Sequence, residues 1–192
     1  MFDKLVQNLN SYLRFTDEEM AFFLSLFETR LVKKNDCFIK VGERCNHVTY
    51  INKGLVRYYY LMDGKEHTAR IFMENDWTGD YAAFLKKTTC TVTIEALEDT
   101  ELFLLSYDNM QRGYEKGKIF ERFGRLMAEA LFIDTVERNS DLFIKTPEAL
   151  YLDLLQKQPE IINRVPLKYI ASMLGIEPES LSRIRKRTIG RP

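Results

Sequence analysis

Apolar side chains recur at helical spacing at both ends of the chain and at alternate positions in the middle. Residues 2–14 place them three or four positions apart, which predicts an amphipathic helix. Thr16 and Glu19 form the capping-box pattern that opens a second helix, running to about Phe27. Across 29–106 the period becomes two, and turn residues separate short apolar runs. The pattern therefore predicts two helices that cover a region of short strands.

The strongest hairpin signal in that region is the Asp63-Gly64 pair, because this dipeptide suits a type I′ turn. The runs that we expect to pair around turns are 55–62 with 65–73, and 91–97 with 101–105. Many short strands at this spacing are typical of a closed or sandwich-like β-barrel. A short helix at 81–87 interrupts them. Its N-terminus offers free N–H groups to a small anion, or the helix simply closes the open side of the barrel.

Residues 108–142 return to helical spacing and predict one long helix. A heptad-like stripe on it consists of Ile119, Phe123, Leu126, Ala130, Ile133 and Glu137, and a second stripe consists of Phe120, Met127 and Leu131. One explanation for two apolar stripes is that the helix packs against the barrel on one side and against a second copy of the chain on the other. The other explanation is that both stripes belong to a single wide face that packs on the core. A domain boundary is expected at about 142–146, followed by a helix over 149–158 that Thr146 caps.

The stretch from Val165 to Arg187 predicts two short helices joined by a tight turn. Gly175 stands where a left-handed residue ends a helix, and Pro178 suits the first turn of the next one. The positions expected to face the core are Leu167, Ile170, Ala171, Leu174, Leu181 and Ile184. This pattern is typical of a helix-turn-helix, whose second helix enters the major groove of DNA. The alternative is an ordinary helical hairpin with a charged outer face.

The distribution of charge supports binding to nucleic acid. The 192 residues have no net charge, yet 164–192 holds seven basic and two acidic residues, a net of +5, so 1–163 carries −5. No apolar run approaches the roughly 18–20 residues of a membrane span, and the N-terminus lacks the pattern of a secretion signal. Three widely spaced cysteines suit a reducing compartment. We therefore expect a cytoplasmic protein without a membrane partner.

The order of the elements resembles that of the Crp/Fnr family of bacterial transcription regulators. The segments that carry the resemblance are 79–96 and 167–186. It implies an α+β protein in which 1–142 is a cyclic-nucleotide-binding-type β-barrel, jelly-roll-like, with a central dimerisation helix at about 108–142. It also implies a winged-helix-like helix-turn-helix domain at 143–192. Because the chain ends at Pro192, we expect the wing to be short or missing.

The resemblance further implies a homodimer, with double-stranded DNA and RNA polymerase as partners. Glu179 and Arg183 match the base-reading positions of the family, and a Glu–cytosine and an Arg–guanine contact suit these residue types. The full set that we expect to contact DNA is Lys168, Glu179, Ser180, Ser182, Arg183, Lys186 and Arg187.

The segment 79–91, which carries the short helix inserted among the strands and which we call the cassette, departs from the cyclic-nucleotide-binding pattern. In members of the family that bind cyclic nucleotides, this segment begins with Gly-Glu and ends with Arg-Ser or Arg-Thr. The glutamate binds the ribose hydroxyl, and the arginine pairs with the cyclic phosphate. The corresponding residues here, a degenerate effector site, are Gly79, Asp80, Cys90 and Thr91. A neutral Cys90 cannot neutralise a phosphate. We therefore expect that the protein does not bind cAMP, and control by a different small effector is the alternative.

No cofactor or metal is expected. Three cysteines cannot supply the four thiolates of an iron–sulfur cluster, and His47 and His67 stand alone. The same lack of clustered ligands argues against an enzyme on a cupin-like barrel. The alternative to a DNA-binding regulator is a ligand- or partner-binding barrel that has lost DNA binding, and the +5 segment argues against it.

Overall fold

The structure, a computed structural model, describes residues 1–189. Two helices come first, α1 (Asp3–Tyr12) and α2 (Asp17–Leu24). Strands follow as β1 (Phe27–Val32), β2 (Cys37–Ile39), β3 (His47–Lys53), β4 (Val56–Met62), β5 (Lys65–Phe72), β6 (Trp77–Thr78), β7 (Thr93–Ala96) and β8 (Thr100–Ser106), with α3 (Tyr81–Lys86) between β6 and β7. The helices after the strands are α4 (Tyr107–Lys116), α5 (Lys118–Ile144), α6 (Pro147–Lys157), α7 (Ile161–Arg164), α8 (Leu167–Met173) and α9 (Pro178–Ile189).

Within these residues the strands form two four-stranded antiparallel sheets, in the orders β1-β8-β3-β6 and β2-β7-β4-β5. The predicted sandwich-like barrel with flanking helices is thus confirmed, although the barrel is open. The β4–β5 hairpin turns at Asp63 and Gly64, both at positive φ (51° and 73°), as the type I′ signal predicts. Helix α2 begins with the predicted capping box, in which Thr16 and Glu19 exchange hydrogen bonds of 2.8 and 3.2 Å.

The long helix predicted over 108–142 is in fact two helices. Gly117 separates α4 from α5 with an extended backbone (φ 174°, ψ 156°) that cannot continue a helix. Glycine is a poor helix former because it loses the most backbone freedom on ordering. The single helix is therefore a wrong prediction at this point, and α5 alone runs for 27 residues.

The apolar stripes of α5 divide along its length. In the N-terminal half, Phe120 and Phe123 are buried in the core that α1, α2 and the first sheet share. In the C-terminal half, Phe132 and Phe143 are 70% and 91% exposed, and Val136 between them is exposed as well. Half of the predicted seam therefore contacts the protein's own core. The exposed residues Phe132, Ile133, Val136 and Phe143 form what we call the outer face of α5.

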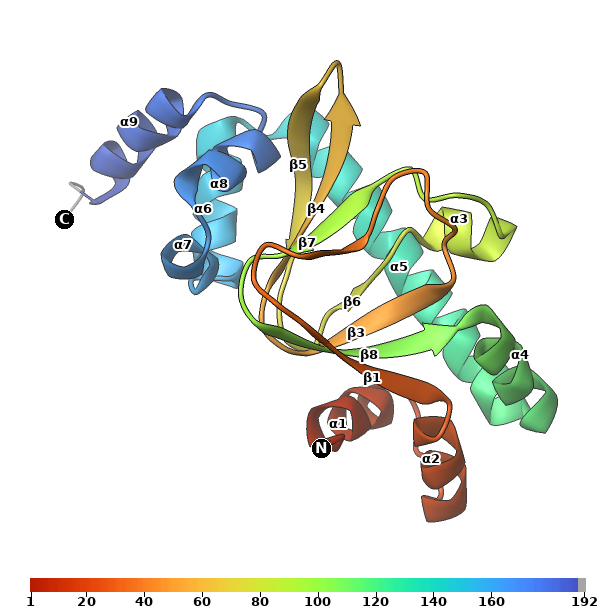
Figure 1. Ribbon diagram of the computed structural model, residues 1–192. Helices are drawn as coiled ribbons and strands as arrows, with labels where there is room; N and C mark the ends of the chain where they lie inside the picture. Colours follow the sequence, from red (N-terminus) through yellow and green to blue (C-terminus); the bar gives the residue numbers. More distant parts are fainter. Residues whose placement is uncertain (190–192) are drawn as a thin grey trace.

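Of the C-terminal helices, α8 lies against β5 of the second sheet, and α9 packs on α8 at the edge of the molecule (Figure 1). A second core cluster joins residues of α6 to α9 with Leu55, Ile71 and Leu97 from the barrel. Helix α7 was not predicted, and α5 ends at Ile144, just before Thr146 caps α6. The division into domains at 142/143 stays a prediction. In residues 1–189, no helix has the length and apolar character needed to cross a membrane.

Candidate nucleic-acid interface and effector cassette

Helices α8 and α9 form the predicted helix-turn-helix. Gly175 between them has φ +69°, the left-handed conformation that its position predicts, and Pro178 begins α9. Leu181 and Ile184 of α9 are buried against Ile170 of α8 in the second core cluster. The apolar side of α9 therefore packs within the protein. Helix α9 lies at the edge of the molecule (Figure 1), and its polar residues are exposed.

The polar side of α9 gathers most of the residues predicted to contact DNA. Glu179, Ser182, Arg183, Lys186 and Arg187 are exposed, and Ser180 is half-buried. Of these, Glu179, Arg183 and Lys186 follow the spacing i, i+4, i+7 and so share one stripe of the helix.

Two local contacts order this surface, and one predicted residue lies off α9. The Nη2 group of Arg183 donates to Ser180 Oγ at 3.2 Å, and Arg187 lies 3.7 Å from the Glu148 carboxylate of α6. Lys168 belongs to α8, where it is exposed and its Nζ lies 4.8 Å from the centre of the Tyr169 ring.

A hollow of about 790 Å³ lies beside this stripe, between α9 and the start of α6. Arg183, Lys186 and Arg187 line it from α9, and Thr146 and Pro147 line it from α6. Thr146 caps α6 by accepting a hydrogen bond from Ala149 N at 3.2 Å. Sequence reasoning missed the α6 side of this surface, because only the tertiary packing brings the start of α6 beside α9.

The cassette residues Asp80 and Thr91 are brought together, and their polar groups satisfy each other. Asp80 is 4% exposed and caps α3, with Oδ1 accepting from Ala83 N at 3.1 Å. Its Oδ2 accepts from both the backbone N and the hydroxyl of Thr91, at 2.7 and 2.8 Å. The carboxylate thus ties the two ends of the cassette together. Gly79 supplies the unusual φ of +148° at its start.

Cys90, at the arginine position of the pattern, is buried and faces a second thiol. Burial raises the pKa of Cys90, and burial together with Cys90 raises the pKa of Cys45 to about 12, so both are neutral thiols near pH 7. The Cys45 thiol donates to the Asp80 carbonyl at 3.3 Å. Lys87, at the end of α3, lies 3.8 Å from the centre of the Tyr107 ring.

Helix α5 is also tied to the second sheet, because Asp134 of α5 forms an ion pair with Arg70 of β5 through both carboxylate oxygens.

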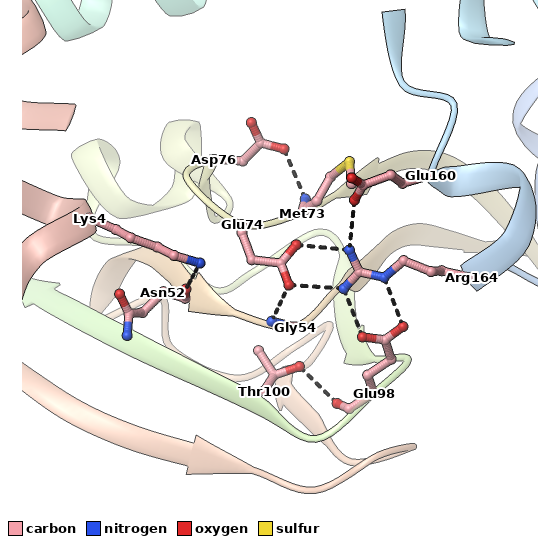
Figure 2. Close-up of polar contacts among 10 residues, drawn as sticks. All are labelled: Lys4, Asn52, Gly54, Met73, Glu74, Asp76, Glu98, Thr100, Glu160 and Arg164. Carbon is pink, nitrogen blue, oxygen red and sulfur yellow. Dashed lines mark hydrogen bonds and ion pairs between the residues drawn. The ribbon is translucent and has the colours of Figure 1, made fainter. Parts of the chain in front are cut away.

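Ion pairs that the sequence did not predict hold the helix-turn-helix unit against the barrel (Figure 2). Arg164 donates to both oxygens of Glu74 at 2.9 Å and to both oxygens of Glu98 at 3.0 and 2.8 Å, and Glu160 lies 3.5 Å away. We call these four residues the interdomain cluster. Its three carboxylates more than offset the charge of Arg164, so this residue contributes to the barrel contact and not to the basic surface of α9.

A buried cation, Arg57, strengthens the same junction. Arg57 of β4 donates to Glu95 and Glu66 at 2.6 and 2.7 Å. Its guanidinium lies between the rings of Tyr59 and Tyr169, 4.1 and 4.0 Å from their centres. Because Tyr169 belongs to α8, this stack joins the first helix of the helix-turn-helix to the second sheet.

Comparisons with known proteins agree with this architecture. Residues 29–116 match the cyclic nucleotide-binding domain family. A regulator of the Crp/Fnr family from Eubacterium rectale superposes with a TM-score of 0.69 at 19% identity, covering 91% of this chain and 84% of that one. The c-di-GMP-responsive regulator CLP of Xanthomonas campestris gives 0.68 at 20%, covering 90% and 91%. The catabolite activator protein of Thermus thermophilus gives 0.58 at 19%, covering 95% and 86%.

None of the curated proteins matches the sequence at a significant level. Residues 29–116 therefore match a cyclic nucleotide-binding domain, and the chain has the fold of the Crp/Fnr transcriptional regulators. The resemblance drawn from the sequence is confirmed in the fold and in the order of its parts.

Proposed function

We propose that this protein is a transcriptional regulator that binds DNA in a sequence-specific manner through α9. The observation that carries the proposal is the division of α9 into two sides. Leu181 and Ile184 anchor it to α8, while Glu179, Arg183 and Lys186 line an exposed stripe. A helix anchored on one side and polar on the other is what major-groove reading requires.

Each residue on the stripe has a role that follows from its chemistry. The planar guanidinium of Arg183 is suited to a bidentate contact with guanine O6 and N7, and Glu179 accepts from a cytosine amino group. Lys168, Lys186 and Arg187 contact phosphates, which position the helix without reading sequence. Ser180 and Ser182, which lie among them, reach either bases or phosphates.

We propose further that two copies pair along α5. The outer face of α5 supports this, since Phe132, Val136 and Phe143 are spaced four and seven residues apart along one side of the helix and are exposed in the single chain. Large apolar side chains in a row on a helix mark an interaction surface more often than a solvated one. A two-fold pair would present two α9 helices to half-sites about 34 Å apart on DNA.

The effector site is proposed not to take cAMP. Support comes from Asp80, whose carboxylate already accepts three hydrogen bonds, and from Cys90, a buried neutral thiol where a phosphate needs a cation. Leaving a phosphate without its charge partner costs about 3–5 kcal/mol, or more than about 100-fold in affinity. Calorimetry with cAMP and cGMP tests this, and micromolar binding of either would contradict it.

The experiment for DNA binding is fluorescence anisotropy with duplex pools at several salt concentrations. The wild-type protein should bind random duplex with an affinity that falls steeply as salt rises, because bound phosphates release counterions. Lys186→Ala should weaken binding to every duplex and reduce the salt slope by about one. Lys33→Ala, which removes an exposed positive charge from the barrel, serves as the control of equal charge. Binding that is absent, or equal in all three proteins, would overturn the proposal.

A further inference from the structure

The three cysteines of the chain lie at one hollow of the barrel. This hollow, of about 250 Å³, is lined by Cys37 of β2, by Cys45 in the loop before β3 and by Cys90 near the end of the cassette. All three are free thiols. Because they are far apart in the sequence, no spacing motif predicts that they share a site.

The backbone brings two of these cysteines, Cys45 and Cys90, onto the same face. Arg44 and Thr89 form an isolated antiparallel bridge, and backbone hydrogen bonds from the N–H groups of the two cysteines flank it, at 3.2 and 2.7 Å. Each cysteine directly follows one residue of the bridged pair. Since paired residues share a face and the next residue turns to the other face, both thiols lie on the face away from the bridged side chains. They are diagonal neighbours there, and they are hydrogen-bonded to each other.

The surroundings keep this pair of thiols protonated. Cys45 and Cys90 are 5% and 4% exposed. Burial, together with the hydrogen bond from Cys90, raises the pKa of Cys45 to about 12, and burial and the carboxylates of Asp80 and Glu43 raise the pKa of Cys90. Neutral buried thiols react slowly with oxidants and alkylating agents. A soft metal ion can still bind them, because it displaces the proton from the sulfur on coordination.

We infer that Cys45 and Cys90 together bind one soft monovalent cation of the Cu(I) type through their two sulfur atoms. Structural zinc needs four ligands. Within residues 1–189, no group of three or more His, Cys, Asp and Glu side chains could hold a metal ion. Thiolate is the ligand that selects Cu(I), and two thiolates are enough to hold this ion.

The binding step balances in atoms and in charge. Two S–Cu bonds replace two S–H bonds, both protons pass to solvent, and neither copper nor sulfur changes its oxidation state. The neutral pair of thiols thereby becomes a complex with one net negative charge. Three cations, Arg30, Lys40 and Arg44, line the same hollow together with the carboxylate of Glu43, so positive charge is available to offset the complex.

The site is connected to both ends of the cassette. The Cys45 thiol donates to the carbonyl of Asp80 at the start of the cassette, at 3.3 Å, and Cys90 precedes Thr91 at its end. Because the ion displaces the proton that Cys45 donates, binding would break this hydrogen bond and tie the loop before β3 to the end of the cassette. Any effect of the ion on DNA binding rests on the proposed function, whereas binding of the ion does not.

The test uses the reduced protein without oxygen and Cu(I) supplied as its coloured bicinchoninate complex. The wild-type protein should remove one Cu(I) per chain from the complex. Cys45→Ser and Cys90→Ala should each weaken binding by more than about 100-fold, since loss of a group that only supports a ligand already costs about 10- to 100-fold. Cys37→Ser is the matched control at the same hollow and should bind as wild type, because the Cys37 thiol is hydrogen-bonded with Tyr59 instead.

X-ray absorption at the copper edge of the loaded wild-type protein should show two sulfur neighbours, and this measurement needs no variant. Failure of the wild-type protein to remove Cu(I) from the complex would overturn the inference. So would equal affinity in all the variants, a loss in Cys37→Ser as large as in Cys45→Ser, or a copper ion with fewer or more than two sulfur neighbours. None of these outcomes bears on DNA binding, because the measurements contain no DNA.

Discussion

Replacing Arg164 by Met should release the helix-turn-helix unit from the barrel while both remain folded. The guanidinium donates four hydrogen bonds of 2.8–3.0 Å to Glu74 and Glu98, and Met keeps only the apolar stem. Breaking a buried pair costs about 3–5 kcal/mol, but an exposed pair is worth only about 0.2–1 kcal/mol. Arg164 and Glu98 are 23% and 35% exposed, so we expect roughly 2 kcal/mol, or about 30-fold in the docking equilibrium.

Native-state hydrogen exchange measures this opening segment by segment. Amides of α8, which docks on β5 through Thr68 N and Ser172 Oγ at 2.9 Å, should exchange about 30-fold faster in Arg164→Met. Amides of β3, inside the barrel, should not change. Lys33→Met, which removes an exposed ion pair with Asp99, is the matched control and should leave α8 protected. Unchanged protection of α8 in Arg164→Met, or equal acceleration in Lys33→Met, would refute the reasoning.

Three further outcomes follow from single residues. Burial alone would raise the pKa of Glu74, but hydrogen bonds from the Arg164 guanidinium and from Gly54 N lower this pKa to about 2. The ionised carboxylate therefore contributes to stability above about pH 4.5, and this contribution should be lost as the pH falls towards 2. Urea unfolding at several pH values should show the loss, and Glu74→Gln should flatten the pH dependence. Gly54 has φ +101°, and a Cβ added there would lie 2.9 Å from Thr100 Cα, so Gly54→Ala should lower the free energy of unfolding by more than about 2 kcal/mol in chemical denaturation. Gly42 has φ +85° but open space around it, so Gly42→Ala should lower the free energy of unfolding by only about 1 kcal/mol. Phe132→Glu should convert a dimer to monomer in analytical ultracentrifugation, and a wild-type protein that sediments as a monomer would contradict the proposed pairing.

Features set by neighbouring residues could be predicted from the sequence. The capping box at Thr16 and the left-handed turn at Gly175 each depend on a few adjacent positions, and both appear as expected. The two-sheet arrangement also followed, because alternation of apolar residues reflects burial on one face. The break at Gly117 was missed, since an isolated glycine within a helical pattern is often tolerated.

Features set by distant residues could not be predicted. Arg164 and Glu74 are 90 positions apart, so only the fold reveals that a basic residue of the C-terminal segment is neutralised by the barrel. Spacing alone placed Cys90 at the arginine position, yet it gave no sign that Asp80 and Thr91 satisfy each other.

Selection of bound duplexes from a random pool by the purified protein shows whether α9 reads DNA sequence. We predict enrichment of an inverted repeat whose half-sites are about one helical turn apart. Arg183→Ala should lose preference at one base pair of each half-site, at about 1–3 kcal/mol, while Lys186→Ala should select the same motif more weakly. Enrichment of no sequence, or the same motif for Arg183→Ala as for wild type, would contradict the account.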